Sequence, residues 1–140
     1  MSKPHFVILG GGYAAVTATQ TLRKAILKGE LDVTVITREN YHNFHGFAAE
    51  MITGRILPSQ ILSPVRRIFP PANVLVAEIT AVDVPTQTIT FKRQIDGIRS
   101  QIHYDHLLVA LGASDNLEAY PGLREHGFRL HTYDGCLRLR

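Results

Sequence analysis

Cysteine is almost absent from this 140-residue sequence, which contains only Cys136. A single cysteine excludes an internal disulfide bond and a CxxC redox pair, and it fits a reducing compartment. Long hydrophobic runs are also missing, because no apolar stretch approaches the roughly 20 residues that a membrane-spanning helix needs. The first four residues lead into a strand-like run and not into the apolar region of a signal peptide. We therefore expect a cytoplasmic protein.

Charge of one sign is not concentrated anywhere in the sequence. The formal net charge is +3, and the basic residues are scattered apart from short clusters such as Arg66-Arg67 and Lys92-Arg93. Aromatic residues are not interleaved with these clusters, as they are in many nucleic-acid-binding surfaces. The sequence therefore argues against nucleic acid as a partner. Its 45% hydrophobic content is enough for the core of one ordinary domain.

Three glycines interrupt an apolar run near the start of the chain. Residues 5–9 are typical of a buried parallel strand, and Gly10 to Gly12 end it. From Tyr13 to about Lys28 the period changes to that of a helix, which Gly29 can close. The apolar positions that recur every four residues are Ala14, Ala18, Leu22 and Ile26. Residues 31–37 are rich in β-branched side chains and predict a second strand.

The glycines match a dinucleotide-binding fingerprint, Gly10-x-Gly12-x-x-Ala15, placed between a strand and a helix. In such a turn the first glycine allows the tight bend, and the second lets the backbone approach a pyrophosphate. The third position packs the helix on the strand, and alanine is tolerated there. The helix N-terminus then offers N–H groups to the phosphates. The alternative is an ordinary strand–helix turn without a ligand.

The second strand ends without the acidic residue that would contact a ribose in this type of site. Thr37 occupies the expected position, and Glu39 follows two residues later. Glu39 reaches the ribose only if the chain turns at Arg38, and otherwise it is a solvent-exposed glutamate. Arg38 lies either beside the adenine or phosphates or in solvent. Both pairs of alternatives stay open at this point.

The rest of the sequence predicts a mixed sheet. Residues 38–71 show no strand pattern, and prolines divide them into two short helical pieces near 47–53 and 60–69. Three alternating runs then predict an antiparallel meander: residues 73–84, 87–92 and 100–105. A buried strand over 106–114 ends in glycine, and residues 120–123 form a turn. Thr132 is a candidate N-cap for a last helix, with Asp134 in its first turn.

Three segments resemble flavoproteins with two dinucleotide-binding domains, the pyridine nucleotide-disulfide oxidoreductase superfamily. "YDHLLVALGAS" (104–114) is similar to the superfamily segment "yDyLviATG", with Leu111 in place of threonine. "VTVITRENYHNF" (33–44) resembles type II NADH dehydrogenases and sulfide:quinone oxidoreductases. "FRLHTYDGCLRLR" (128–140) resembles the segment that enters the NADH domain. The fingerprint, the meander and the final strand also occur in the family's order.

This resemblance implies an α/β fold, a Rossmann-like FAD-binding domain of the glutathione-reductase class. The helix from Tyr13 would cover one face of a parallel sheet and the meander the other. Residues 1–140 would be the N-terminal part of this domain, with the NAD(P)H domain and the C-terminal part outside this chain. Such a truncated sheet would leave apolar surface uncovered, so we expect the chain to self-associate through the meander and the helix that starts near Thr132.

The full-length protein would pass hydride from NAD(P)H through FAD to a quinone or another acceptor, and it could lie peripherally at the inner face of a membrane. The alternatives are a sulfide:quinone oxidoreductase and a non-catalytic dinucleotide-binding module. No residue of this chain is expected to be catalytic. The residues expected to bind the cofactor are Gly10, Gly12, Tyr13, Ala14, Thr37, Arg38, Glu39, Ile79, Ala110 and Gly112.

Several residues depart from the family pattern or invite other interpretations. Residues 40–60 contain no cysteine, which excludes the disulfide reductases of the superfamily, and Cys136 is interpreted as a small packing residue. The segment 44–51 replaces the usual "F-x-P-L-L", and its Phe44, Phe47 and Met51 either wall the flavin or form ordinary core. The histidine pairs 42/45 and 103/106 lack further ligands, so no metal site is predicted.

Overall fold

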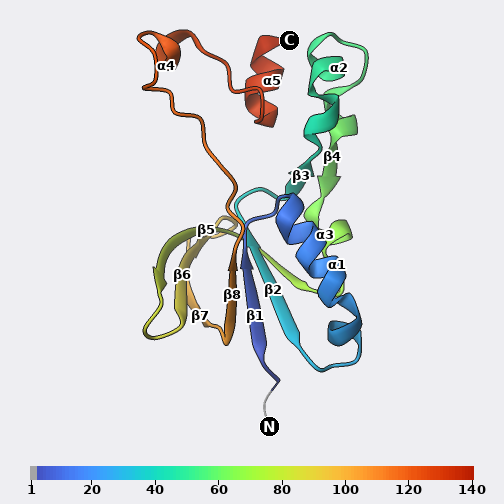
Figure 1. Ribbon diagram of the computed structural model, residues 1–140, viewed down its shortest axis with the longest axis vertical. Helices are drawn as coiled ribbons and strands as arrows, with labels where there is room; N and C mark the ends of the chain where they lie inside the picture. Colours follow the sequence, from blue (N-terminus) through green and yellow to red (C-terminus); the bar gives the residue numbers. More distant parts are fainter. Residues whose placement is uncertain (1–2) are drawn as a thin grey trace. The chain divides into compact units, whose positions relative to one another are not determined.

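The computed structural model describes residues 3–140 and divides the chain into two compact units. The first unit contains the chain up to His42 together with residues 64–112. The second contains residues 43–63 and 113–140. Figure 1 shows the sheet of the first unit and the short helices of the second. Each unit is described by itself.

A six-stranded sheet forms the first unit, in the order β7-β6-β5-β2-β1-β8. Strand β1 is parallel to both β2 and β8, and β2 is parallel to β5. Strand β6 is antiparallel to both β5 and β7, which confirms the predicted parallel sheet with an antiparallel meander. The strands are β1 (His5–Leu9), β2 (Asp32–Thr37), β5 (Asn73–Asp83), β6 (Thr88–Arg93), β7 (Arg99–His103) and β8 (His106–Val109). The last strand is shorter than predicted, since it ends at Val109.

The two faces of this sheet carry separate hydrophobic cores, because successive side chains of a strand point to opposite faces. On one face, Ile8 and Val35 pack with Ala15 of the helix that follows β1 and with Phe69. On the other, Val7, Leu9 and Ile36 pack with the meander residues Ile89 and Phe91. The helix therefore covers one face and the meander the other, as the resemblance implies.

Helix α1 (Tyr13–Leu27) packs three of its four predicted apolar positions, Ala18, Leu22 and Ile26, against the core of this face. Ala15 and Thr19 are buried, whereas Ala14 is exposed. Ala15 occupies the third fingerprint position, which packs the helix against the sheet, and this contact sets the rotation of the first turns. Gly29 closes the helix as predicted: its φ is +72°, and its N–H donates to the carbonyl of Ile26 over 2.9 Å.

The segment after β2 contains two short strands that the sequence pattern does not predict. Strands β3 (Tyr41–Asn43) and β4 (Leu62–Pro64) form a two-stranded sheet. Three residues per strand are too few to show an alternation, and the pairing joins segments far apart in the sequence. The predicted helical piece at 60–69 is wrong as one element, because it divides into the end of η2 (Pro58–Ile61), β4 and α3 (Val65–Ile68).

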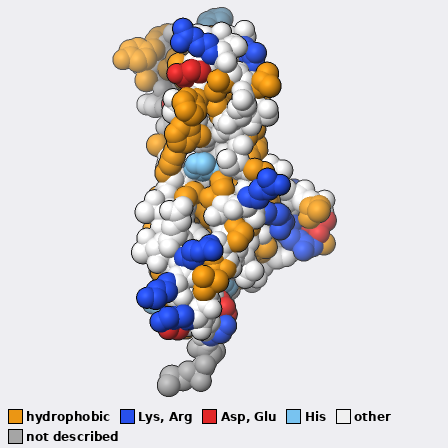
Figure 2. All heavy atoms as spheres, turned by 90° about the vertical axis from the view of Figure 1, so that its right-hand side faces the viewer, with side chains coloured by type: hydrophobic (Ala, Val, Ile, Leu, Met, Phe, Trp, Pro, Cys, Tyr) orange, Lys and Arg blue, Asp and Glu red, His pale blue; other side chains and the backbone are white. Residues whose placement is uncertain are grey.

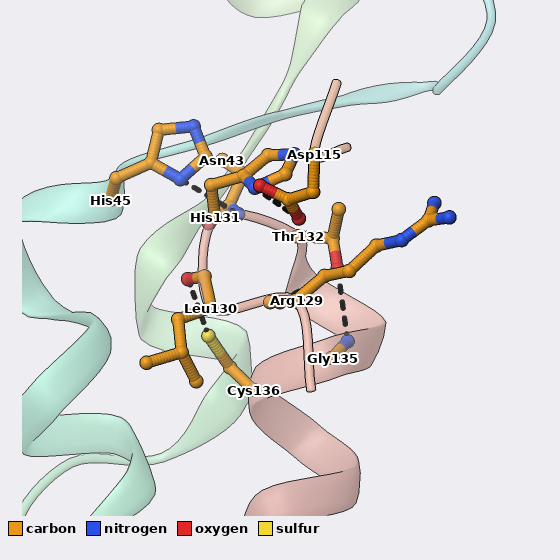
Figure 3. A network of polar contacts seen from close by, with 9 residues as sticks. All are labelled: Asn43, His45, Asp115, Arg129, Leu130, His131, Thr132, Gly135 and Cys136. Carbon is orange, nitrogen blue, oxygen red and sulfur yellow. Dashed lines mark hydrogen bonds and ion pairs between the residues drawn. The ribbon is translucent and has the colours of Figure 1, made fainter. Parts of the chain in front are cut away.

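The second unit has a small core in which Met51, Ile61 and Cys136 are buried. Its remaining helices are η1 (His45–Phe47), α2 (Ala48–Ile52), α4 (Leu123–His126) and α5 (Tyr133–Leu139). Thr132 is the N-cap of α5 and accepts a hydrogen bond from the Gly135 N–H, as predicted (Figure 3). Among residues 3–140, no helix is both long and apolar enough to cross a membrane.

Large hydrophobic side chains remain exposed on this second unit (Figure 2). They come from the segment before α2, from the loop after it and from the C-terminal segment: Phe44, Phe47, Leu57, Phe128, Leu130, Leu137 and Leu139. Met51 is different because it lies in the core of the unit. Of the three residues considered for a flavin wall, Met51 is therefore core, while the Phe44 and Phe47 rings are exposed with centroids 5.3 Å apart.

Candidate dinucleotide-binding site

Gly10 lies where β1, β2 and the end of β8 meet. Its N–H donates to the carbonyl of Ile36 over 2.8 Å, and its φ of +110° is one that side-chain-bearing residues rarely adopt. A Cβ at this position would lie 2.2 Å from the carbonyl oxygen of Ala110. The close approach of the segment after β8 therefore requires glycine. The fold brings Gly10 and Ala110 of the predicted site together.

Gly12 has the opposite environment. It is the N-cap of α1, its φ is −85°, and apart from the adjoining residues of the chain no atom lies within 4 Å of the place where a Cβ would be. The Val16 N–H donates to the Gly12 carbonyl over 3.1 Å and starts the helix. Any small residue would satisfy this backbone, so the chain's own packing does not explain the glycine. An open space at the N-terminus of a 15-residue helix suits the phosphates of a dinucleotide.

Gly11, between them, is enclosed by two side chains, one from the end of β2 and one from the middle of β3. Thr37 is buried, and its Oγ1 would lie 2.5 Å from a Cβ at Gly11. His42 Nδ1 lies 3.0 Å from the Gly11 carbonyl oxygen, and its ring meets Tyr13 edge-on. In the sequence, the spacing of His42 and His45 suggests only a possible metal pair, and nothing links His42 to the glycine turn.

The end of β2 places Thr37 inward and the two charged residues outward. The Thr37 hydroxyl donates to the carbonyl of Glu39 over 3.2 Å, so it stabilises the bend of its own segment. Arg38 Nε lies 3.2 Å from Glu39 Oε1, and both side chains are exposed. The Arg38 carbonyl accepts a hydrogen bond from Gln94 Nε2 over 2.7 Å, which ties the bend to the segment after β6. The chain does turn at Arg38, as a ribose contact by Glu39 requires.

The other predicted site residues fall into two groups. Tyr13 and Ala14 are exposed in the first turn of α1, and Gly112 follows β8 with a φ of +77° and open space at its Cα. These three residues form the first group, because Tyr13 and Ala14 directly follow the glycine turn and Gly112 lies in the segment after β8 that approaches it. Ile79 lies on β5 at a bulge, opposite Phe91, and packs against the meander core.

Cys136 is a packing residue of the second unit (Figure 3). Its side chain is buried, and Sγ donates to the carbonyl of Leu130 over 2.9 Å. Burial raises the pKa of this thiol, which disfavours the nucleophilic thiolate. His131, in the preceding segment, pairs with Asp115 through Nδ1 and Oδ2 at 3.1 Å. In residues 3–140, no three His, Cys, Asp or Glu side chains are grouped as metal ligands.

Comparison with known proteins identifies the family to which this chain belongs. Residues 4–140 match the family described as pyridine nucleotide-disulphide oxidoreductase. An NADH dehydrogenase-like protein of Mycobacterium tuberculosis is 32% identical over 143 aligned residues, covering 96% of this chain and 33% of that protein. A type II NADH:quinone oxidoreductase of the same organism is 28% identical, covering 96% of this chain and 28% of its own length.

The fold also matches solved structures. The NDH2 protein of Plasmodium falciparum, solved in complex with NADH, aligns with a TM-score of 0.82 at 24% identity. The alignment covers 99% of this chain and 28% of that protein. This chain thus spans about a third of the length of the relatives it matches.

Proposed function

Because the chain belongs to the pyridine nucleotide-disulphide oxidoreductase family, we propose that it is the N-terminal part of an FAD-binding domain. The observation that carries the proposal is the contrast within the glycine turn. Gly10 is required by the contact with Ala110, whereas the space beside Gly12 is open. If the turn served only the packing of the chain, Gly10 would be required and Gly12 would not. The residues present therefore fit a dinucleotide pyrophosphate.

In this proposal the chain's residues bind and orient the cofactor. Gly12 and the N-terminus of α1 receive the pyrophosphate, and the helix dipole favours its negative charge. Glu39 accepts hydrogen bonds from the ribose hydroxyls, and Ala110 and Gly112 continue the binding surface after β8. FAD, when bound, supplies the hydride and electron chemistry, while the protein fixes its position. None of these residues acts as an acid, base or nucleophile.

The parent enzyme would then transfer hydride from NAD(P)H through FAD to a quinone or another acceptor. The similarity to NADH dehydrogenase-like and NADH:quinone oxidoreductase proteins supports this reaction class. Association with the inner face of a membrane belongs to the same proposal. The buried Cys136 is unsuited to sulfide chemistry, so a sulfide:quinone oxidoreductase would need its reactive cysteines outside this chain.

The full-length protein tests the proposal directly. It should purify yellow, and NADH or NADPH should bleach the flavin absorbance. Gly12→Val should lose FAD while keeping the circular dichroism spectrum and unfolding midpoint of the wild type, because the valine would fill only the open space. A folded, colourless protein that gains no flavin on reconstitution would end the proposal. Equal FAD affinity of the wild type and Gly12→Val would show that the glycine turn has only a structural role and does not bind the cofactor.

A further inference from the structure

The carbonyl of Gly11 is held by a histidine from a later segment of the chain. His42 Nδ1 lies 3.0 Å from this oxygen in partly buried surroundings. A carbonyl oxygen only accepts hydrogen bonds, so Nδ1 must carry the proton and donate it. The neutral ring with its proton on Nδ1 and the imidazolium both satisfy this contact. The bond therefore requires a particular ring nitrogen but not a charged histidine.

Two further contacts restrict this arrangement. The His42 ring meets the ring of Tyr13 edge-on, with centroids 4.8 Å apart and an interplanar angle of 84°. Tyr13 is the first residue of α1, so the histidine contacts both the turn and the helix that follows it. Thr37 lies against the Cα of Gly11 so closely that a Cβ there would be 2.5 Å from its hydroxyl. The backbone of Gly11 is thus packed against Thr37 while His42 holds its carbonyl.

This contact fixes the direction of the next N–H group. The Gly11 carbonyl and the Gly12 N–H belong to one planar trans peptide, so they point in opposite directions. A carbonyl directed at His42 therefore turns the Gly12 N–H away from the histidine. Gly12 caps α1 beside open space, where backbone N–H groups can bind an anion. Without the histidine, rotation of this peptide would weaken that donor.

We infer that His42 is a positioning residue for the dinucleotide pyrophosphate: it orients the Gly11–Gly12 peptide so that the Gly12 N–H can bind a phosphate oxygen. The inference rests on the proposed FAD site. It does not require that His42 touch the cofactor. Because the histidine acts through one donated hydrogen bond, a side chain that donates from a similar position should replace it.

The first test needs no cofactor. In the full-length apo-protein labelled at glycine and histidine, His42 Nδ1 should have the 15N shift of a protonated ring nitrogen at neutral pH. His42→Phe should shift the Gly11 carbonyl 13C and Gly12 amide 15N resonances. The matched control is His106→Phe, at the opposite end of β1, which should leave both in place. An unprotonated Nδ1, or resonances unchanged by His42→Phe, would overturn the inference.

The second test measures FAD binding to the same proteins. His42→Phe keeps an aromatic ring against Tyr13 but cannot donate, so FAD should bind roughly fivefold to tenfold more weakly, the effect of one hydrogen bond. His42→Asn supplies an amide donor and should recover most of this loss. His106→Phe should bind FAD like the wild type. Wild-type affinity in His42→Phe would refute the inference, and so would a His42→Asn variant as weak as His42→Phe, because packing alone would then explain the effect.

The two tests separate this inference from the function on which it rests. If the wild type binds no FAD, the proposed function fails and the inference falls with it, although the resonances still report the His42 contact. If the wild type binds FAD and His42→Phe binds it equally well, only the inference fails. Unfolding midpoints of all variants show whether a loss of affinity reflects a loss of folded protein.

Discussion

At the scale of single residues, Gly10 and Gly12 are predicted to respond oppositely to a methyl group. Gly10→Ala places a Cβ 2.2 Å from the Ala110 carbonyl oxygen at a φ of +110°, so it should lower the free energy of unfolding by at least about 2 kcal/mol. Gly12 has an ordinary φ and open space around it, so Gly12→Ala should change the free energy of unfolding by less than about 1 kcal/mol. Urea unfolding of both variants measures the difference. Equal destabilisation would show that the close approach to Ala110 is not real.

Glu39 is the second residue whose role can be tested by substitution. If it accepts a ribose hydrogen bond, Glu39→Gln in the full-length protein should weaken FAD binding by about 1.5–3 kcal/mol. Its ion pair with Arg38 is exposed, so stability should change by no more than about 1 kcal/mol. The matched control is Glu30→Gln, which removes a similar exposed pair with Lys28 at the opposite end of α1. Flavin fluorescence titration measures the FAD affinity of each variant. An affinity of Glu39→Gln equal to that of the wild type would show that Glu39 is a solvent-exposed residue without a ribose contact.

At the scale of elements, the sequence predicts the helices and strands whose hydrophobic pattern lies within one continuous segment. The strand–glycine–helix–strand unit and the meander are visible because hydrophobic periodicity changes at glycines and turns. Strands β3 and β4 are not visible, since each has three residues and pairs across a long loop. The four-residue spacing places Ala14 on the buried stripe with Ala18, Leu22 and Ile26, but in the first turn Ala15 is the residue that packs against the sheet. The contact of His42 with Gly11 likewise depends on tertiary structure alone.

The hairpin between β6 and β7 should lose stability in acid. The Ile98 N–H and the Arg93 guanidinium hold the pKa of Asp96 below its ordinary value of about 4. A depressed carboxyl pKa adds stability above the unfolded-state pKa, and this contribution is lost as the pH falls through the folded-state pKa. Asp96→Asn should therefore be less stable than the wild type at pH 7. The difference in stability between the two proteins should become smaller below about pH 4.

Unfolding midpoints measured across this pH range check the hairpin prediction. Ile95→Ser, in the same turn, changes an exposed side chain that does not ionise, so its difference from the wild type should stay constant with pH. A gap between Asp96→Asn and the wild type that is equally wide at pH 7 and pH 3 would show that the carboxylate charge does not contribute.

At the scale of the whole molecule, we assign the expected self-association to one edge of the six-stranded sheet. Among residues 3–140, β8 has only β1 as a neighbour, so one side of it is an unpaired sheet edge. Val109 on this strand and Leu111 just after it are exposed. Unpaired strand edges and exposed apolar patches recruit other chains. The opposite edge, β7, belongs to the meander expected to form the contact, but it carries more polar residues and is the weaker candidate.

We therefore expect this 140-residue chain to associate at micromolar concentrations through the β8 edge. Val109→Lys should reduce association, because a charged side chain on an edge strand opposes pairing with another strand. Val84→Lys is the control: it adds the same charge at an exposed apolar position just after β5, away from that edge. Light scattering over a dilution series measures the effect. A strictly monomeric wild type would contradict the prediction, and an equal reduction by both variants would indicate nonspecific charge repulsion rather than pairing at β8.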